Sequence, residues 1–134
     1  MSTHSRDESE IRKLIEDWAL AVRNEDYPGI LARHSDDIVM FDVPPPFEST
    51  GMAEYQQSWQ LFFSVQPRPV AFDIQRLDVV AGAEVGFAFA LMQCREFGSR
   101  GELRTLDFRL TVGLRKVAGH WTIVHEHHSV PATD

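Results

Sequence analysis

The chain has 134 residues, 43% apolar and 25% charged, which is typical of one globular domain with a single core. Its 13 basic and 20 acidic residues give a formal charge of −7, which disfavours unspecific binding to nucleic acid or to an anionic membrane. The sequence lacks a membrane-length apolar run, an apolar leader and any second cysteine to pair with Cys94, so we expect a cytoplasmic protein without membrane or nucleic-acid partners.

The first third of the chain has helical spacing. Residues 1–6 are expected to be frayed, and an amphipathic helix is predicted from about residue 7 to residue 24 because its apolar residues recur every three or four positions: Ile11, Leu14, Ile15, Trp18, Ala19 and Val22. Asp26 and Pro28 suit the cap and first turn of a short second helix. We expect residues 35–37 to end it.

A short strand is predicted at residues 38–43, with Asp42 near its end. It must stop at the three prolines 44–46, because proline has no amide donor for a ladder. A third helix follows from residue 50 and ends before Pro67. This helix is unusually aromatic, with Met52, Tyr55, Trp59, Phe62 and Phe63 at helical spacing.

The second half of the chain predicts four long antiparallel strands. The first, residues 70–80, has a slip of phase that indicates a β-bulge near residues 75–76. The next begins at residue 85 and alternates bulky with small side chains, so we expect its bulky face to be buried: Val85, Phe87, Phe89 and Leu91. Helices followed by antiparallel strands, without a repeat or linker, indicate one α+β domain.

Residues 104–116 form the third of these strands and alternate strictly. One face is apolar, with Leu106, Phe108, Leu110, Val112 and Leu114, and the other carries Asp107, Arg109 and Thr111. The last strand ends in a His-Glu-His-His sequence at residues 125–128. The register of the hairpin decides which of these four residues lie beside Arg109 and Thr111, because a shift by one residue moves every side chain to the other face.

Two registers are open for this hairpin. A two-residue turn pairs Arg109 with His128, whereas a type I turn with Gly119 in the left-handed conformation adds a bulge and pairs Arg109 with His127. We favour the bulged register, because the two-residue turn requires a positive φ at Ala118. It places His125 and His127 on the face of Asp107, Arg109 and Thr111.

Several stretches resemble the SnoaL-like branch of the nuclear transport factor 2-like superfamily, which includes ketosteroid isomerase and scytalone dehydratase. They are residues 11–22, residues 35–44, Gly51 with Tyr55 and Trp59, and residues 115–127. The resemblance covers nearly all of residues 1–134 and implies a cone-shaped α+β domain, with three N-terminal helices packed in a curved, mostly antiparallel sheet. Such folds serve enzymes, binding modules and assembly domains alike.

The resemblance also implies roles for single residues. Asp42 matches the strand-end aspartate that shuttles protons in ketosteroid isomerases, a system that is a standard worked case of tuned carboxyl groups. The position of the oxyanion tyrosine holds Trp18, and that of the protonated acid falls near Thr111, so we do not expect steroid isomerisation. A gapless comparison with ketosteroid isomerase places Glu126 and His128 inside, so both faces of the last strand stay open.

The favoured register predicts an apolar pocket with acid–base groups at one end. Its catalytic candidates are Asp42, His125 and His127, and its substrate-binding candidates are Trp18, Tyr55, Trp59, Asp107, Arg109 and Thr111. These groups suit a cofactor-independent isomerase, cyclase, dehydratase or hydrolase acting on a small hydrophobic carbonyl compound or carboxylate. A non-catalytic binding or assembly domain is the alternative.

Purely structural interpretations accompany each candidate. Asp42 is also placed to cap the turn at Pro44. Asp107 and Arg109 are placed to satisfy each other's hydrogen-bonding groups in a purely structural network. Metal binding by His125 and His127 with Asp42 is disfavoured by the guanidinium of Arg109, so we expect neither metal nor cofactor.

A homodimer is expected from the apolar face of residues 104–116. Three modest helices can cover only one side of the sheet, so an apolar face on the other side needs a second copy. Sheet-to-sheet pairing is also common in the resembling family. In the competing arrangement this face packs under the helices, and Asp107 and Arg109 are surface residues.

Overall fold

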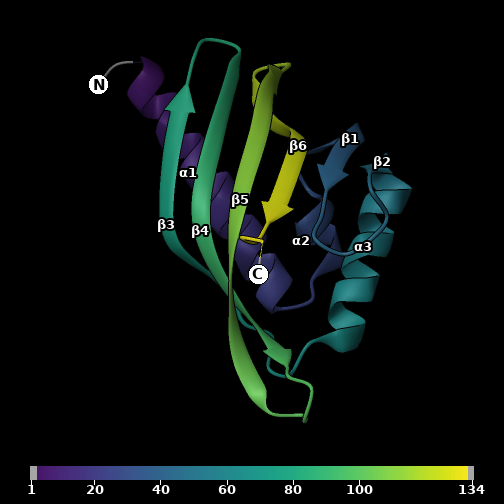
Figure 1. Cartoon of the computed structure of the whole chain (residues 1–134). Coiled ribbons are helices and arrows are strands. Elements are labelled where there is room, and N and C mark those ends of the chain that lie inside the picture. The colour runs from purple at the N-terminus through teal and green to yellow at the C-terminus, as the bar shows by residue number, and fades with distance from the viewer. Residues whose placement is uncertain (1–2, 133–134) are drawn as a thin grey trace.

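The computed structural model describes residues 3–132 (Figure 1). In chain order its elements are α1 (Thr3–Arg23), α2 (Tyr27–Leu31), β1 (His34–Phe41), β2 (Ser49–Thr50), α3 (Met52–Val65), β3 (Phe72–Ala81), β4 (Val85–Phe97), β5 (Leu103–Val117) and β6 (His120–Ser129). This order confirms the predicted α+β class.

The six strands form one curved sheet in the order β2-β1-β6-β5-β4-β3. In the described part of the chain β1 and β6 are the one parallel pair, so the sheet is mostly antiparallel, as expected. Figure 1 shows α1 running behind β3, β4 and β5, while α3 stands beside β1. The helices therefore cover one face of the sheet, which we call the inner face, and leave the outer face open.

The inner face and α1 build the core. The apolar stripe of α1 is buried as its spacing predicts, with Ile11, Ile15 and Val22 fully covered. Small residues on β4 let this helix approach closely, since a Cβ added at Gly86 would lie 3.3 Å from Ile11 Cδ1. The apolar face of β5 lies under the helices: Phe108, Leu110, Val112 and Leu114 are buried.

Several predicted boundaries need correction. Helix α1 already includes residues 3–6, which were expected to be frayed, whereas residues 1–2 lie outside the described part of the chain. Residues 35–37 do not end a helix but belong to β1, which starts at His34. The cap of α2 is confirmed, because Asp26 Oδ1 accepts from Gly29 N, and so is the bulge of β3, where the register shifts between Ile74 and Arg76.

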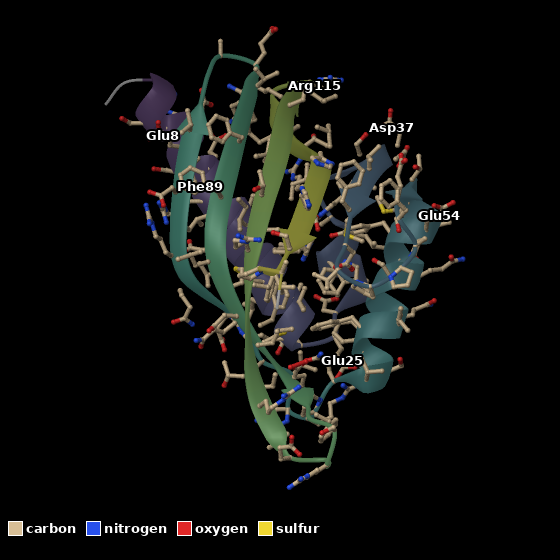
Figure 2. All side chains as sticks on the ribbon, in the orientation of Figure 1. Glu8, Glu25, Asp37, Glu54, Phe89 and Arg115 are labelled. Atoms are coloured by element: carbon tan, nitrogen blue, oxygen red, sulfur yellow. The ribbon has the colours of Figure 1, made fainter. Side chains whose placement is uncertain are left out.

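The prediction for the faces of β4 was wrong. Its small side chains Ala88 and Ala90 are buried, while its bulky ones point outward; Phe87, Phe89 and Leu91 keep 46%, 42% and 49% of their surface exposed. The helix packed against this strand leaves room only for small residues, so the large side chains take the other face. Phe89 is labelled on β4 in Figure 2.

The favoured register of the last hairpin was also wrong. Val117 pairs with His120 across a two-residue turn in which Ala118 and Gly119 have φ values of 50° and 80°, the mirror-image turn typical of hairpins. A bulge follows further along β6, because Leu114 pairs with Ile123 but Gly113 pairs with residue 125. Thr111 therefore pairs with His127, and Arg109 pairs with Ser129.

The bulge at Val124 decides the faces of β6. Trp121 and Ile123 before it, and Glu126 and His128 after it, are all buried on the inner face. His125 and His127 take the outer face instead. Across residues 3–132, none of the helices is both long and apolar enough to cross a membrane.

Candidate functional site

A cavity of about 730 Å³ opens where α3 ends beside the strands. Aromatic and aliphatic side chains form most of its wall: Trp59, Phe62, Phe72, Phe97, Leu106 and Phe108. Polar groups come from the end of β1 with Asp42, the end of β6 with His128, and the end of β4 with Glu96. An apolar cavity with a few convergent polar groups is the usual form of a small-molecule site.

His128 is the titratable side chain that joins this cavity to the core. Its ring stacks on Phe108, with centroids 5.9 Å apart and planes 10° apart, and its edge contacts Trp59. Its Nε2 lies 3.1 Å from Glu126 Oε1. Its Nδ1 has no hydrogen bond within the described residues, so this nitrogen is free to contact a ligand.

Behind His128, Glu126 is fully buried in a hydrogen-bonded network. Its Oε2 lies 2.6 Å from His34 Nε2 and accepts from the hydroxyl of Tyr55 at 2.7 Å. Tyr55 in turn accepts from Trp18 Nε1 at 3.1 Å. Every one of these side chains is buried, as a polar network in a core requires.

His34 links this network to the start of β1. Its Nδ1 lies 2.8 Å from the carbonyl oxygen of Ala32, and its Nε2 faces the carboxylate of Glu126, so both ring nitrogens meet acceptors. The two oxygens of Glu126 are thereby divided, with Oε2 facing His34 and Tyr55 and Oε1 facing His128.

The network shifts the pKa values of its members. Burial alone would raise the pKa of Glu126, but hydrogen bonds from His128 and His34 and their charges outweigh it and lower the pKa to about 2. Burial lowers the pKa of His128, but the hydrogen bond and charge of Glu126, with the charge of Asp42, raise it above 6.5 in sum. Burial and Glu126 raise the pKa of Tyr55, which stays a donor.

Asp42 reaches the cavity beside His128. The parallel pairing of Met40 with Glu126 and of Phe41 with His127 places Asp42 next to His128 on the inner face. One carboxylate oxygen, Oδ1, accepts from the backbone of Val43 at 2.8 Å, which is the turn-capping contact expected for a strand-end aspartate. Asp42 therefore caps its turn and lines the cavity at once.

Cys94 also lines the cavity, but it is not activated. Burial, with smaller contributions from Glu96 and Asp42, raises the pKa of its thiol to about 11, so the thiol stays protonated at neutral pH. Within residues 3–132 no cluster of three or more histidine, cysteine, aspartate or glutamate side chains is arranged to hold a metal ion.

The structure brings only some of the predicted residues to the cavity. Asp42 and Trp59 line it. Trp18 and Tyr55 lie behind it, in the network that holds Glu126.

The other five predicted residues lie on the outer face, so their expected place in the pocket was wrong. His125 Nδ1 lies 2.7 Å from the carbonyl oxygen of Val39, and Asp107 accepts from Gln93 at 2.8 Å. Arg109 donates from Nε to Ser129 at 3.1 Å, while Thr111 and His127 are exposed. The reason is that the apolar face of β5 packs in the core, which turns Asp107, Arg109 and Thr111 outward. The predicted grouping of His125 and His127 with these residues is confirmed, because the bulge at residue 124 places both histidines on the same outer face.

Two residues of the network were not among the favoured candidates, and a third was missed altogether. Glu126 and His128 belonged to the register that we did not favour, although the adjacent apolar pair Ile123 and Val124 breaks the alternation and marks a bulge. His34 lies at the start of β1, directly before residues 35–37, which were expected to end the second helix. Only the parallel pairing of β1 with β6 brings it to Glu126.

Comparisons with known proteins agree with this architecture. A profile of the SnoaL-like domain matches residues 11–133. An NTF2-like protein of unknown function from Pseudomonas putida KT2440 is 34% identical, with 98% of this chain and 92% of that chain covered and a TM-score of 0.87.

Two more distant structures share the fold. A ketosteroid isomerase-like protein from Erwinia carotovora atroseptica SCRI1043 is 20% identical over 95% of this chain and 98% of its own, with a TM-score of 0.78. A protein of unknown function with a cystatin-like fold from Nostoc punctiforme PCC 73102 is 16% identical over 99% of this chain and 97% of its own, with a TM-score of 0.81. No curated protein matches the chain.

Proposed function

The chain belongs to the SnoaL-like domain family, and on that premise we propose that it is a cofactor-independent acid–base enzyme acting on a small hydrophobic carbonyl compound. The observation that carries the proposal is His128, a titratable group in an aromatic cavity that is held from behind by a buried carboxylate. A histidine in such a place can both take and return a proton near neutral pH.

The proposed reaction moves a proton between two atoms of the substrate. His128 donates from Nε2 to Glu126, so its free Nδ1 abstracts a proton from a carbon next to the carbonyl group. The electron pair of the broken C–H bond moves to the carbonyl oxygen and forms an enolate. The imidazolium, stabilised by Glu126 and Asp42, then returns the proton to another carbon or to oxygen.

Isotope exchange tests this proposal without knowledge of the natural substrate. A panel of hydrophobic ketones is incubated in D₂O, and NMR follows the loss of the proton next to the carbonyl group. We expect His128→Gln to slow the catalysed exchange at least about 100-fold, the usual contribution of a general base, while ligand binding persists. His127→Gln, one residue away on the outer face, is the matched control and should exchange at the wild-type rate.

The outcomes separate an enzyme from a binding domain. If the wild type exchanges no ketone faster than buffer although the same ketones raise its melting temperature, the cavity is a non-catalytic binding site. If His127→Gln slows the exchange as much as His128→Gln does, the assignment of the catalytic base to His128 on the inner face is wrong.

We also propose that two copies pair through the outer face of the sheet. Five apolar side chains form one exposed group there, which we call the outer strip: Val80, Val85, Phe87, Phe89 and Leu91. The argument from the apolar face of β5 no longer applies, because that face lies in the core. The outer strip now supports the proposed dimer, because monomers rarely expose contiguous groups of large apolar residues.

A second copy is the occupant that the charges beside the strip favour. Arg76 and Asp78 flank it on β3, and Arg109 and Asp107 lie across on β5. A two-fold interface needs a surface complementary to itself, and a strip bordered on both sides by both signs of charge meets that need.

A further inference from the structure

Among residues 3–132, the lining of the cavity contains carboxylates but no side chain of lysine or arginine. Its lining includes the carboxylates of Asp42 and Glu96. The C-terminal end of α3 contributes Val65 and Gln66 to the wall, and the backbone carbonyls of a helix end carry partial negative charge.

The arginines beside the cavity bind other groups of the protein, and Arg95, between the lining residues Cys94 and Glu96, donates to the carbonyl oxygen of Pro69. Arg104 pairs with Glu96 at 3.1 Å in a largely exposed contact. Arg68 donates to the carbonyl of Phe63 and pairs with Glu25 at 2.8 Å. Arg109, the expected anchor for a carboxylate, lies on the outer face with Ser129.

Protonation of His128 does not make the net charge of the cavity groups positive. Glu126 lies behind the cavity and not in its lining, and Glu96 pairs with Arg104, so among the described residues Asp42 is the lining carboxylate that has no ion pair. When His128 gains a proton, Asp42 balances it. The charge of the cavity groups is thus negative or zero, and an anionic ligand meets repulsion or no net attraction.

We infer that the cavity selects uncharged or cationic aromatic ligands and rejects carboxylates of the same shape. The walls support this inference, since aromatic side chains such as Trp59, Phe62 and Phe97 attract both flat apolar rings and cations. The inference rests on the proposed ligand-binding role of the cavity, and it narrows the substrate class to carbonyl compounds without an acid group.

Three naphthalene ligands that differ only in charge test the inference: 2-naphthylmethylamine, naphthalene-2-carboxamide and 2-naphthoate. Calorimetric titration at pH 8 should give at least about tenfold weaker binding for the naphthoate than for the other two, the size of one charge interaction in a partly buried site. Asp42→Asn should reduce the advantage of the amine over the naphthoate several-fold. Asp107→Asn, the same change on the outer face, should leave it unaltered.

Each result has one meaning. Naphthoate binding as tight as the amide overturns the charge selectivity and leaves the ligand-binding role intact. Failure of all three ligands to bind at millimolar concentration overturns both. A selectivity that Asp42→Asn and Asp107→Asn leave equally unchanged also overturns the inference, because the negative charge then does not come from the cavity.

Discussion

Glu126 and His128 lie two residues apart on β6, and both side chains are buried on the inner face with His128 Nε2 at 3.1 Å from Glu126 Oε1. Alternation along a strand puts residues i and i+2 on one face, so this contact follows from the backbone alone. The carboxylate lies on the core side of the ring and leaves the other nitrogen for the cavity. The imidazole of His128 is thereby positioned by the strand alone.

Replacing Glu126 with glutamine should lower the pKa of His128. Glutamine keeps the shape of the side chain but removes the charge that favours the imidazolium. The burial of His128, which lowers its pKa, is then the largest remaining influence. NMR titration of the imidazole C–H signals measures this shift directly. A midpoint of His128 that does not fall would mean that Glu126 does not control its pKa.

Acid should destabilise the fold through Glu126. Its pKa is about 2 in the folded chain against an ordinary 4.5, so between these values the unfolded chain binds more protons, and the free energy of unfolding falls as pH falls. The loss amounts to about 3 kcal/mol at most by linkage. Urea unfolding at pH 6, 4 and 3 measures it, and Glu126→Gln should flatten the slope whereas Asp107→Asn should not.

The helices and the bulge of β3 were predictable because they depend on spacing within one segment. Ile11, Ile15 and Val22 face the core since a helix buries one stripe, and the phase slip near Gln75 is visible without any partner strand. Asp42 and Trp59 line the cavity, but their place there was expected from the family resemblance and not from spacing.

The faces of β6 were not predictable from the hairpin turn alone. Ala118 adopts the positive φ that its side chain disfavours, and the bulge at Val124 then reverses the side chains beyond it. His34 depends on a parallel pairing between distant parts of the chain. Such contacts are set by tertiary packing, which has no local period in the sequence.

Removal of His34 should shift the pH dependence of catalysis to higher pH. In His34→Gln the short contact of His34 Nε2 with Glu126 is lost, so the carboxylate holds the proton on His128 more strongly, and the exchange profile should move by about one pH unit. His125→Gln removes an imidazole of the outer face and should leave the profile in place. If His34→Gln fails to fold, Tyr55→Phe removes one donor to Glu126 and should shift the profile in the same direction.

The pairing of two copies predicts the effect of a charge in the outer strip. Phe89 lies in the middle of the strip with 42% of its surface exposed, so Phe89→Glu should leave the core intact and separate the copies. Sedimentation at micromolar concentration should show a dimer for the wild type and a folded monomer for the variant. Phe47→Glu changes a side chain that is 98% exposed outside the strip, and this control should remain a dimer.

Phe108→Glu distinguishes this arrangement from the one in which the apolar face of β5 forms the interface. Phe108 is buried and stacks on His128, so a carboxylate there has no partner and should unfold or aggregate the chain rather than yield a monomer. A folded monomer from Phe108→Glu, together with a dimer from Phe89→Glu, would move the interface to the opposite face of the sheet. Sedimentation of the two variants at one concentration, with circular dichroism as the check on folding, measures both outcomes.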